Sequence, residues 1–154
     1  MHLTAWKYQC GHCGEEYVLP GCDLSFAYGN FLGVSRNGEA AVLEAVGSET
    51  FDELRLLIDV DPRVRGLTSR ERISLLHEAL SLVFDPDSRG DDFAFVGSPG
   101  CPNCSSRAIA SFTETSEPVP VRAGRVTHHR WDSMTDDEQR RLVTSFLDRS
   151  VDGA

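Results

Sequence analysis

Three stretches of the chain repeat apolar residues at the three- and four-residue spacing of a helix that buries one face. They are residues 48–59, 68–84 and 133–150. The positions expected to face a core are Phe51, Leu54, Leu57 and Ile58 in the first helix, Ile73, Leu76, Leu80 and Val83 in the second, and Leu142, Val143, Phe146 and Leu147 in the third.

Polar residues at the ends of these stretches predict where each helix begins or stops. The expected N-terminal caps are Ser48, a capping box of Thr68 with Glu71, and a second box of Thr135 with Glu138. Asp85-Pro86 should end the second helix, because a residue that precedes proline avoids the helical conformation.

Other stretches carry the aromatic, β-branched and alternating residues typical of strands. Residues 31–45 centre on Asn37-Gly38, the strongest short signal for a two-residue type I′ hairpin turn. The remaining predicted strands lie in residues 5–9, 15–19, 91–100 and 105–115, and residues 115–124 read as a proline-broken linker or edge.

These elements predict an α+β fold in one domain, since 154 residues is an ordinary domain size. A ribbon of β-hairpins would comprise residues 1–22 and 93–115. An insertion over residues 23–92 would hold a hairpin and two helices. Residues 116–154 would form a linker and a C-terminal helix.

Composition places the chain among globular proteins, with 40% hydrophobic and 25% charged residues. The N-terminus shows no basic region followed by an apolar run, and no stretch is apolar enough to cross a bilayer, so we expect a soluble cytoplasmic protein. Lys7 is the only lysine among the 15 basic residues, a bias associated with GC-rich bacterial genomes.

Four of the five cysteines form two C-x-x-C pairs, "CGHCG" at residues 10–14 and "CPNC" at residues 101–104. In a reducing cytosol such pairs are metal ligands or redox centres more often than disulfides. A thioredoxin-type motif needs a pair that opens a helix, and neither pair does. The pattern favours one Zn²⁺ held by Cys10, Cys13, Cys101 and Cys104, with iron as the alternative metal.

The two pairs with their flanking strands resemble the zinc-ribbon superfamily, over roughly residues 5–20 and 93–113. The resemblance implies facing hairpin turns around a structural zinc ion, and it implies a scaffold rather than an activity. The chain departs from the pattern in two ways. A long insertion separates the pairs, and Ser105 stands where a glycine often follows the second pair.

Other metal-ligating residue types have simpler interpretations. His12 lies inside the first turn and is expected to face solvent or form a hydrogen bond, and Cys22 is expected to be a small buried residue. His77 has no sequence neighbour that suggests a partner. His128 and His129 would point to opposite faces of a strand and would not converge, beside a buried Trp131. Asp85, Asp87 and Gly90 match only the start of a calcium loop, so an acidic turn is the favoured interpretation.

The charge pattern bears on function. The net charge is −9, and acidic residues outnumber basic ones in residues 1–30, 31–96 and 97–154 alike. Nucleic-acid binding is therefore disfavoured, although it remains an alternative for a zinc ribbon, with a thin cluster of Arg122, Arg125 and Arg130. No catalytic motif is found; an enzyme with an unrecognised site around His128 and His129 is a second alternative.

The favoured function is a non-enzymatic protein-interaction module of inhibitor, immunity or assembly type that binds a basic partner. Asp85, Asp87, Asp91 and Asp92 crowd at one turn, where exposed acids would repel one another. This turn is either the docking point for that partner or a solvated loop that aids solubility. Oligomeric state is left open.

Overall fold

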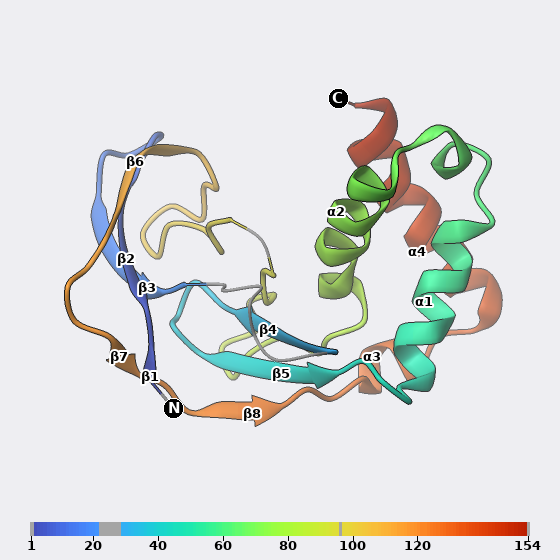
Figure 1. The fold of residues 1–154 in the computed structure, drawn as a ribbon, viewed down its shortest axis with the longest axis horizontal. Coiled ribbons are helices and arrows are strands. Elements are labelled where there is room, and N and C mark those ends of the chain that lie inside the picture. Colours follow the sequence, from blue (N-terminus) through green and yellow to red (C-terminus); the bar gives the residue numbers. More distant parts are fainter. Residues whose placement is uncertain (1, 22–28, 96, 154) are drawn as a thin grey trace. The chain divides into compact units, whose positions relative to one another are not determined.

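The structure is a computed structural model that describes residues 2–21, 29–95 and 97–153 (Figure 1). It confirms an α+β fold with small, mainly antiparallel sheets and four α-helices among the described residues. Internal contacts divide the chain into two compact units. The first comprises Met1–Glu44 and Pro86–Val126, and the second comprises Ala45–Asp85 and Thr127–Ala154. The segment boundaries and the single domain expected above stay predictions.

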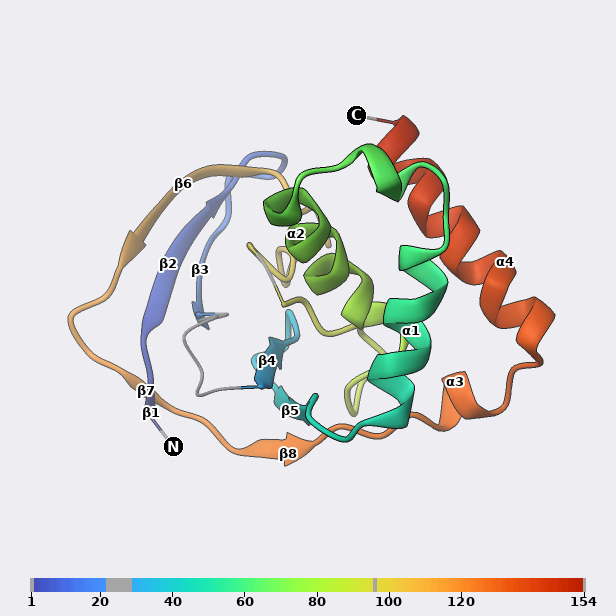
Figure 2. The same cartoon turned by 45° about the vertical axis from the view of Figure 1, so that its right-hand side comes forward.

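A three-stranded antiparallel sheet in the first unit carries the first cysteine pair. Its order is β3-β2-β6, with β2 at Ala5–Cys10, β3 at Glu16–Pro20 and β6 at Ile109–Glu114. The strands predicted on either side of residues 10–14 are thereby confirmed. Figure 2 shows β6 running along β2 at the edge of this sheet. All six residues of β6 are exposed, as an edge strand allows.

A hairpin of β4 (Asn30–Val34) and β5 (Ala40–Glu44) forms around Asn37-Gly38, but the predicted two-residue turn is wrong. The Ser35 N–H bonds the Glu39 carbonyl, and the Gly38 N–H bonds the Ser35 carbonyl, which leaves a three-residue loop. Only Gly38 of that loop has a positive φ, of 80°. A type I′ turn requires positive φ at both central residues, so the loop takes the next commonest hairpin form.

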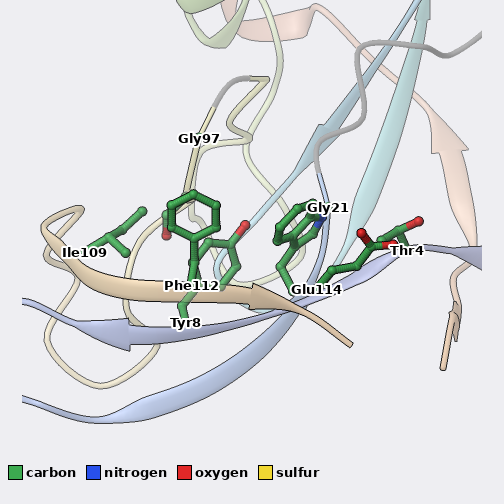
Figure 3. Close-up of a pocket in the computed structure, with 9 residues that line it drawn as sticks. Thr4, Tyr8, Gly21, Gly97, Ile109, Phe112 and Glu114 are labelled. Atoms are coloured by element: carbon green, nitrogen blue, oxygen red, sulfur yellow. The ribbon is translucent and has the colours of Figure 1, made fainter. Parts of the chain in front are cut away.

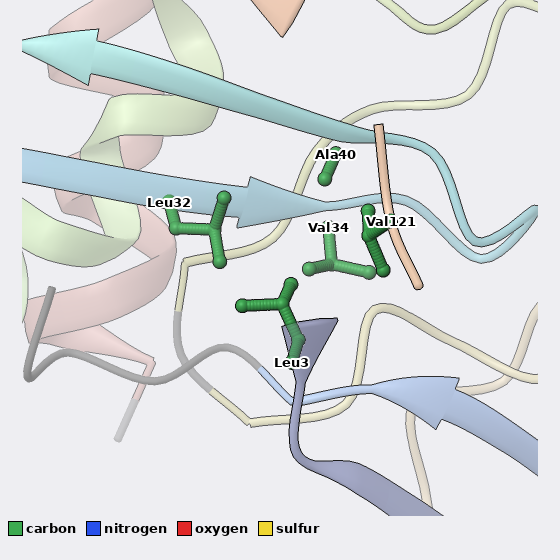
Figure 4. Packing of buried hydrophobic residues seen from close by; sticks show 5 residues of the cluster. All are labelled: Leu3, Leu32, Val34, Ala40 and Val121. Carbon is green, nitrogen blue, oxygen red and sulfur yellow. The ribbon is translucent and has the colours of Figure 1, made fainter. Parts of the chain in front are cut away.

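The proline-broken segment supplies two short edge strands, as expected. β7 (Val119–Pro120) pairs with β1 (His2–Leu3), and β8 (Ala123–Arg125) lies parallel to β5. Val121, between them, packs in a buried cluster (Figure 4). The cluster comprises Leu3, Leu32, Val34, Ala40 and Val121.

The strand predicted to lead into the second cysteine pair does not form among the described residues of 91–100. Only an isolated bridge between Val34 and Ala94 is present. Gly97 and Gly100 both adopt positive φ, which an extended strand cannot accommodate. The second pair therefore lies on a loop that precedes β6 instead of at the tip of a regular hairpin.

The second unit is helical, and its capping residues are those predicted. The elements are α1 (Glu49–Asp59), the 3₁₀ turn Val64–Gly66, α2 (Ser69–Ala79), the 3₁₀ turn Leu80–Leu82, α3 (His129–Asp132), α4 (Asp136–Leu147) and a π turn at Asp148–Asp152. Ser48 Oγ accepts from the Phe51 N–H at 3.2 Å. Capping boxes form at Thr68 and at Thr135.

The buried face of α2 differs from the predicted one. Ile73 is 55% exposed, whereas Leu75 and Ala79 are buried. The α-helix also stops at Ala79, short of the end predicted at Asp85-Pro86, and a tighter 3₁₀ turn follows it. Leu80 and Val83 are buried, as predicted.

Trp131 is fully buried in this unit, and its Nε1–H donates to Glu53 at 3.0 Å. Arg63 pairs with Asp61, Asp148 and Asp152, and so ties the 3₁₀ turn after α1 to the end of the chain. Along the described part of the chain, no helix is both long and apolar enough to cross a membrane.

Candidate metal centre

The four predicted cysteine ligands converge in the first unit. Cys10 ends β2 and Cys13 lies in the turn that follows, while Cys101 and Cys104 lie in the loop before β6. Their Sγ atoms all lie within 4.8 Å of one another. The sequence motif and the structure therefore place the same four thiols together.

The sulfur separations fit an ion and do not fit disulfides. The Cys10 and Cys104 Sγ atoms are 3.5 Å apart, and the Cys13 and Cys101 Sγ atoms are 3.7 Å apart. A tetrahedral site with Zn–S bonds of about 2.3 Å has S···S edges of about 3.8 Å, whereas a disulfide needs about 2.05 Å. All four cysteines are free thiols.

The two cysteine turns share one pattern of backbone hydrogen bonds. In the first, the Gly14 N–H bonds the Cys10 carbonyl at 3.1 Å and the Cys10 N–H bonds the Glu15 carbonyl at 2.9 Å. The second turn has both bonds at the equivalent positions. The Ser105 N–H bonds the Cys101 carbonyl at 2.8 Å, and the Cys101 N–H bonds the Ser106 carbonyl at 2.9 Å. Two turns of the same geometry thus present their thiols to a common centre.

The residue after each pair has a left-handed backbone. Gly14 has φ 76°, and Ser105 has φ 65°, the only positive φ of a non-glycine residue in the described chain. Ser105 therefore takes the glycine conformation despite its side chain, whose hydroxyl is bonded by Arg36. A serine in place of the usual glycine at residue 105 therefore leaves the conformation of the turn unchanged.

Backbone and side-chain N–H groups stabilise the thiolates of the first pair. The N–H groups of Cys13 and then of His12 point at Cys10 Sγ, and they lower the pKa of Cys10 to about 6. The Glu15 N–H, followed by the Asn103 side-chain amide, lowers the pKa of Cys13. A thiolate is the form that binds a metal, so the first pair is prepared for coordination.

Cys104 behaves differently because it shares the space with the other sulfurs. The Ser106 N–H favours its thiolate, but burial and the neighbouring thiols outweigh that bond and raise the pKa of Cys104 to about 12. Packing four negative charges this closely requires a cation to offset them. A divalent ion would supply that charge and displace the remaining protons.

The site is buried on one side and reaches the surface on the other. Cys10 and Cys101 are buried, whereas Cys13 is exposed. Tyr8, Tyr17 and Leu19 pack on the buried side, and the two tyrosine rings stack with centroids 5.3 Å apart. Burial raises the pKa of Tyr17, whose hydroxyl is 2.9 Å from Ser98 Oγ.

Among the described residues, no histidine belongs to the group of ligand atoms that the four thiols form. His12 is exposed, as expected, and contributes its backbone N–H to Cys10 Sγ. We expected His128 and His129 on a strand, but His128 is the N-cap and His129 the first residue of the short helix α3. His128 Nδ1 contacts the Val83 carbonyl, while His129 is exposed.

Burial lowers the pKa of His77, and thus favours its neutral form. Cys22 lies outside the described residues.

Of the four aspartates of the acidic turn, only Asp92 is exposed as the sequence led us to expect; the other three form internal hydrogen bonds. Asp87 is only 7% exposed, and its carboxylate accepts the N–H groups of Arg89 and Asp91 and the Asn37 amide. Asp91 pairs with Arg36 at 2.7 Å and also accepts from Asn37. These carboxylates hold the loop together.

The adjacent Asp85 has a similar structural role in the other unit. Its carboxylate accepts the N–H groups of His129 and Arg130 and the Thr127 hydroxyl. It therefore fastens the start of α3. The sequence could have suggested this role, since an aspartate commonly accepts backbone N–H groups at turns, but the partners lie more than forty residues away.

Comparisons with protein-family models, with curated proteins and with solved structures found no match for this chain.

Proposed function

We propose that the chain binds one Zn²⁺ through Cys10, Cys13, Cys101 and Cys104, as the structural centre of a zinc-ribbon-like module. The convergence of the four Sγ atoms carries the proposal. The repeated backbone hydrogen bonds of the two turns support it. So do the N–H groups near the sulfurs: those of His12 and Cys13 point at Cys10 Sγ, and that of Ser106 favours the Cys104 thiolate.

The proposed role of the ion is structural and not catalytic. Catalytic zinc sites keep a position open for water or substrate, and they use three protein ligands. Here the four thiolates would fill a tetrahedral shell and leave no open position. The ion would join the turn after β2 to the loop before β6 and so hold the β3-β2-β6 sheet to the segment that carries Cys101.

The biological role that we propose is a non-enzymatic interaction with a basic protein partner in a reducing compartment. The net charge of −9 supports it, since an acidic surface attracts basic partners and repels nucleic-acid phosphates. The Asp85–Asp92 turn is not offered as the docking point, because Asp85, Asp87 and Asp91 are engaged in internal hydrogen bonds.

Metal content tests the first part of the proposal. Elemental analysis of the purified chain should find about one zinc ion per molecule, and the Cys13→Ser/Cys104→Ser variant should lose it. Cys22→Ser is the matched control and should keep it. A zinc-free protein, or a double variant that still binds zinc stoichiometrically, would refute the site; a red, iron-containing protein would change the metal but keep the ligands.

Affinity capture from the native host tests the interaction role. A basic protein that is captured at low salt and released as ionic strength rises is the expected result. Capture of RNA or DNA, with a gel shift at moderate salt, would favour the alternative of a nucleic-acid-binding ribbon. Turnover of a substrate that is lost in His128→Ala or His129→Ala would favour the enzyme alternative.

A further inference from the structure

A pocket of about 370 Å³ opens on the β3-β2-β6 sheet of the first unit (Figure 3). Three aromatic side chains line it, those of Trp6, Tyr8 and Phe112, together with Ile109 and the carboxylate of Glu114. Figure 3 shows Tyr8, Ile109 and Phe112 rising from one face of the strands toward Gly97. The volume suits a small ligand or one side chain of a partner.

The strand register brings the three rings and the carboxylate together. Tyr8 on β2 lies opposite Phe112 on β6. Trp6 and Glu114, each two residues away on the same strand, form the next pair on that face. Side chains two apart on a strand share a face, so all four point to the same side. The Trp6 and Phe112 ring centroids are 5.7 Å apart with the planes tilted by 52°, so the rings form two walls of a corner.

The indole of Trp6 packs directly against Gly21. A Cβ atom at residue 21 would lie 2.5 Å from both Cδ1 and Nε1 of Trp6, so only glycine leaves room for the ring. Phe112, in contrast, is 60% exposed, and Ile109 is 37% exposed. An inner ring packed against Gly21 and an accessible outer ring form an arrangement that a ligand can complete, since exposed apolar surface gains from being covered.

The chemistry of the lining selects for positive charge. Aromatic faces are electron-rich and attract cations. The alkyl groups on an alkylated ammonium nitrogen also pack well against rings. Glu114 adds a full negative charge, and none of the described lining residues is basic. A phosphate or a nucleotide would meet that carboxylate unfavourably.

We propose that this pocket binds an alkylated ammonium group, as carried by a methylated lysine side chain or by a free quaternary ammonium compound. The pocket shares Tyr8 with the packing beside the four thiols, but none of its described lining residues is a cysteine, and the proposal does not depend on which metal the thiols hold. It supplies a specific contact for a basic partner, and it would stand even if the metal centre proved to be different.

Binding is measured on the full chain as purified, by calorimetry and by ¹⁵N NMR of the two indole N–H groups. The probes are choline, its neutral carbon analogue 3,3-dimethylbutanol, and a short alanine peptide with one central Nε-trimethyllysine or one unmodified lysine. Choline or the trimethyllysine peptide should bind at least about five-fold more tightly than its counterpart, the range expected for a cation–π contact. The Trp6 indole resonance should shift, and that of the buried Trp131 should not.

Two variants test the walls of the pocket, each with a matched control on the same sheet. Phe112→Leu keeps an apolar side chain but removes the ring, and Glu114→Gln removes the charge; each should weaken cation binding about three-fold or more. Val18→Ala and Glu16→Gln change an exposed apolar residue and an exposed acid on the opposite face, as the register with Lys7 and Gln9 shows, and should leave binding unchanged.

The outcomes separate the possible ligands. Binding of the trimethyllysine peptide without choline would assign the site to a protein partner, and binding of choline alone would assign it to a small solute. Equal affinity for choline and dimethylbutanol would overturn the proposal in favour of a plain apolar pocket. It would also fail if adenosine monophosphate bound in their place, or if no probe shifted the Trp6 resonance at millimolar concentration.

Discussion

At the scale of single residues, the first unit depends on a few side chains whose roles are set by hydrogen bonds. Asp87 is the clearest case, since its buried carboxylate accepts from two backbone N–H groups and from the Asn37 amide. A buried acceptor that loses its charge weakens each of these bonds. The loop between the second unit and the second cysteine pair is therefore fastened at Asp87.

Replacing Asp87 with asparagine should lower the free energy of unfolding of the first unit by about 1–3 kcal/mol. An amide at this position offers one acceptor oxygen instead of two and adds N–H groups close to the donors already there. Urea denaturation followed by NMR of the first unit measures the change. Asp59→Asn, at an exposed position at the end of α1, is the control and should stay within about 0.5 kcal/mol of wild type.

The same residue predicts a pH dependence. Burial alone would raise the pKa of Asp87, but the bonds from Asn37 and the other donors lower it on balance. A folded-state pKa below the unfolded value of about 3.9 contributes stability above that pH, and the contribution is lost as pH falls through the folded value. The wild type should therefore lose its advantage over Asp87→Asn in acid below about pH 4. An advantage that persisted to pH 2 would contradict this assignment.

Gly14 provides a residue-scale test of the first cysteine turn. Gly14→Ala should cost about 1 kcal/mol, because φ of 76° is unfavourable for any residue with a Cβ. Crowding is not the cause, since a Cβ there meets no described atom within 4 Å. Gly124→Ala has equally open surroundings without a positive φ. If both variants melt alike, backbone conformation does not explain the glycine.

At the scale of elements, local and distant interactions contribute separately. The helices begin where their capping residues stand, because a cap bonds N–H groups only two or three residues away. The strands of the β3-β2-β6 sheet depend on pairing across nearly the whole chain, as β2 with β6 shows. Helix starts are thus local properties, and the sheet is not.

Removing the cap of α4 should have a measurable local cost. Thr135→Ala deletes the hydroxyl that accepts from the Glu138 N–H and should destabilise the second unit by about 1 kcal/mol. Thr144→Ala removes a hydroxyl from an exposed position in the same helix and should be neutral or slightly stabilising, because alanine is the better helix former. Thermal melts followed by circular dichroism compare the two, and equal losses would contradict the capping role.

At the scale of the whole molecule, the metal centre and the helices belong to different compact units. The four thiols join segments that are about ninety residues apart in sequence. Closing so long a loop removes much entropy from the unfolded chain, so a bound ion should stabilise the first unit by several kcal/mol. The helical unit has its own buried residues and capping boxes.

Complete removal of the metal by a chelator should therefore loosen one unit before the other. Amide hydrogen exchange in β2, β3 and β6 should accelerate by an order of magnitude or more, whereas α1 and α4 should keep most of their protection. The near-ultraviolet signal of Trp131 should persist. Unchanged exchange in the sheet would show that the ion contributes nothing to stability, and loss of both units together would show that they fold as one.

The sequence by itself determined the features that rest on near neighbours or on a rigid chemical requirement. Helix starts were predicted from the capping residues Ser48, Thr68 and Thr135, because a cap acts within one turn. The two C-x-x-C pairs predicted that four thiols would meet, because a tetrahedral metal site takes four ligands however far apart they lie in sequence, and the four Sγ atoms do lie together.

Tertiary structure decided the features that depend on which distant groups meet. The sequence could not show that Asn37 would bond Asp87 and Asp91, fifty or more residues away, and so turn an expected docking loop into an internal one. Nor could it show that Phe112 would lie beside Trp6, or that Leu75 and not Ile73 would be buried on α2. Pairing register and packing across the fold set these neighbours, and local residue preference does not.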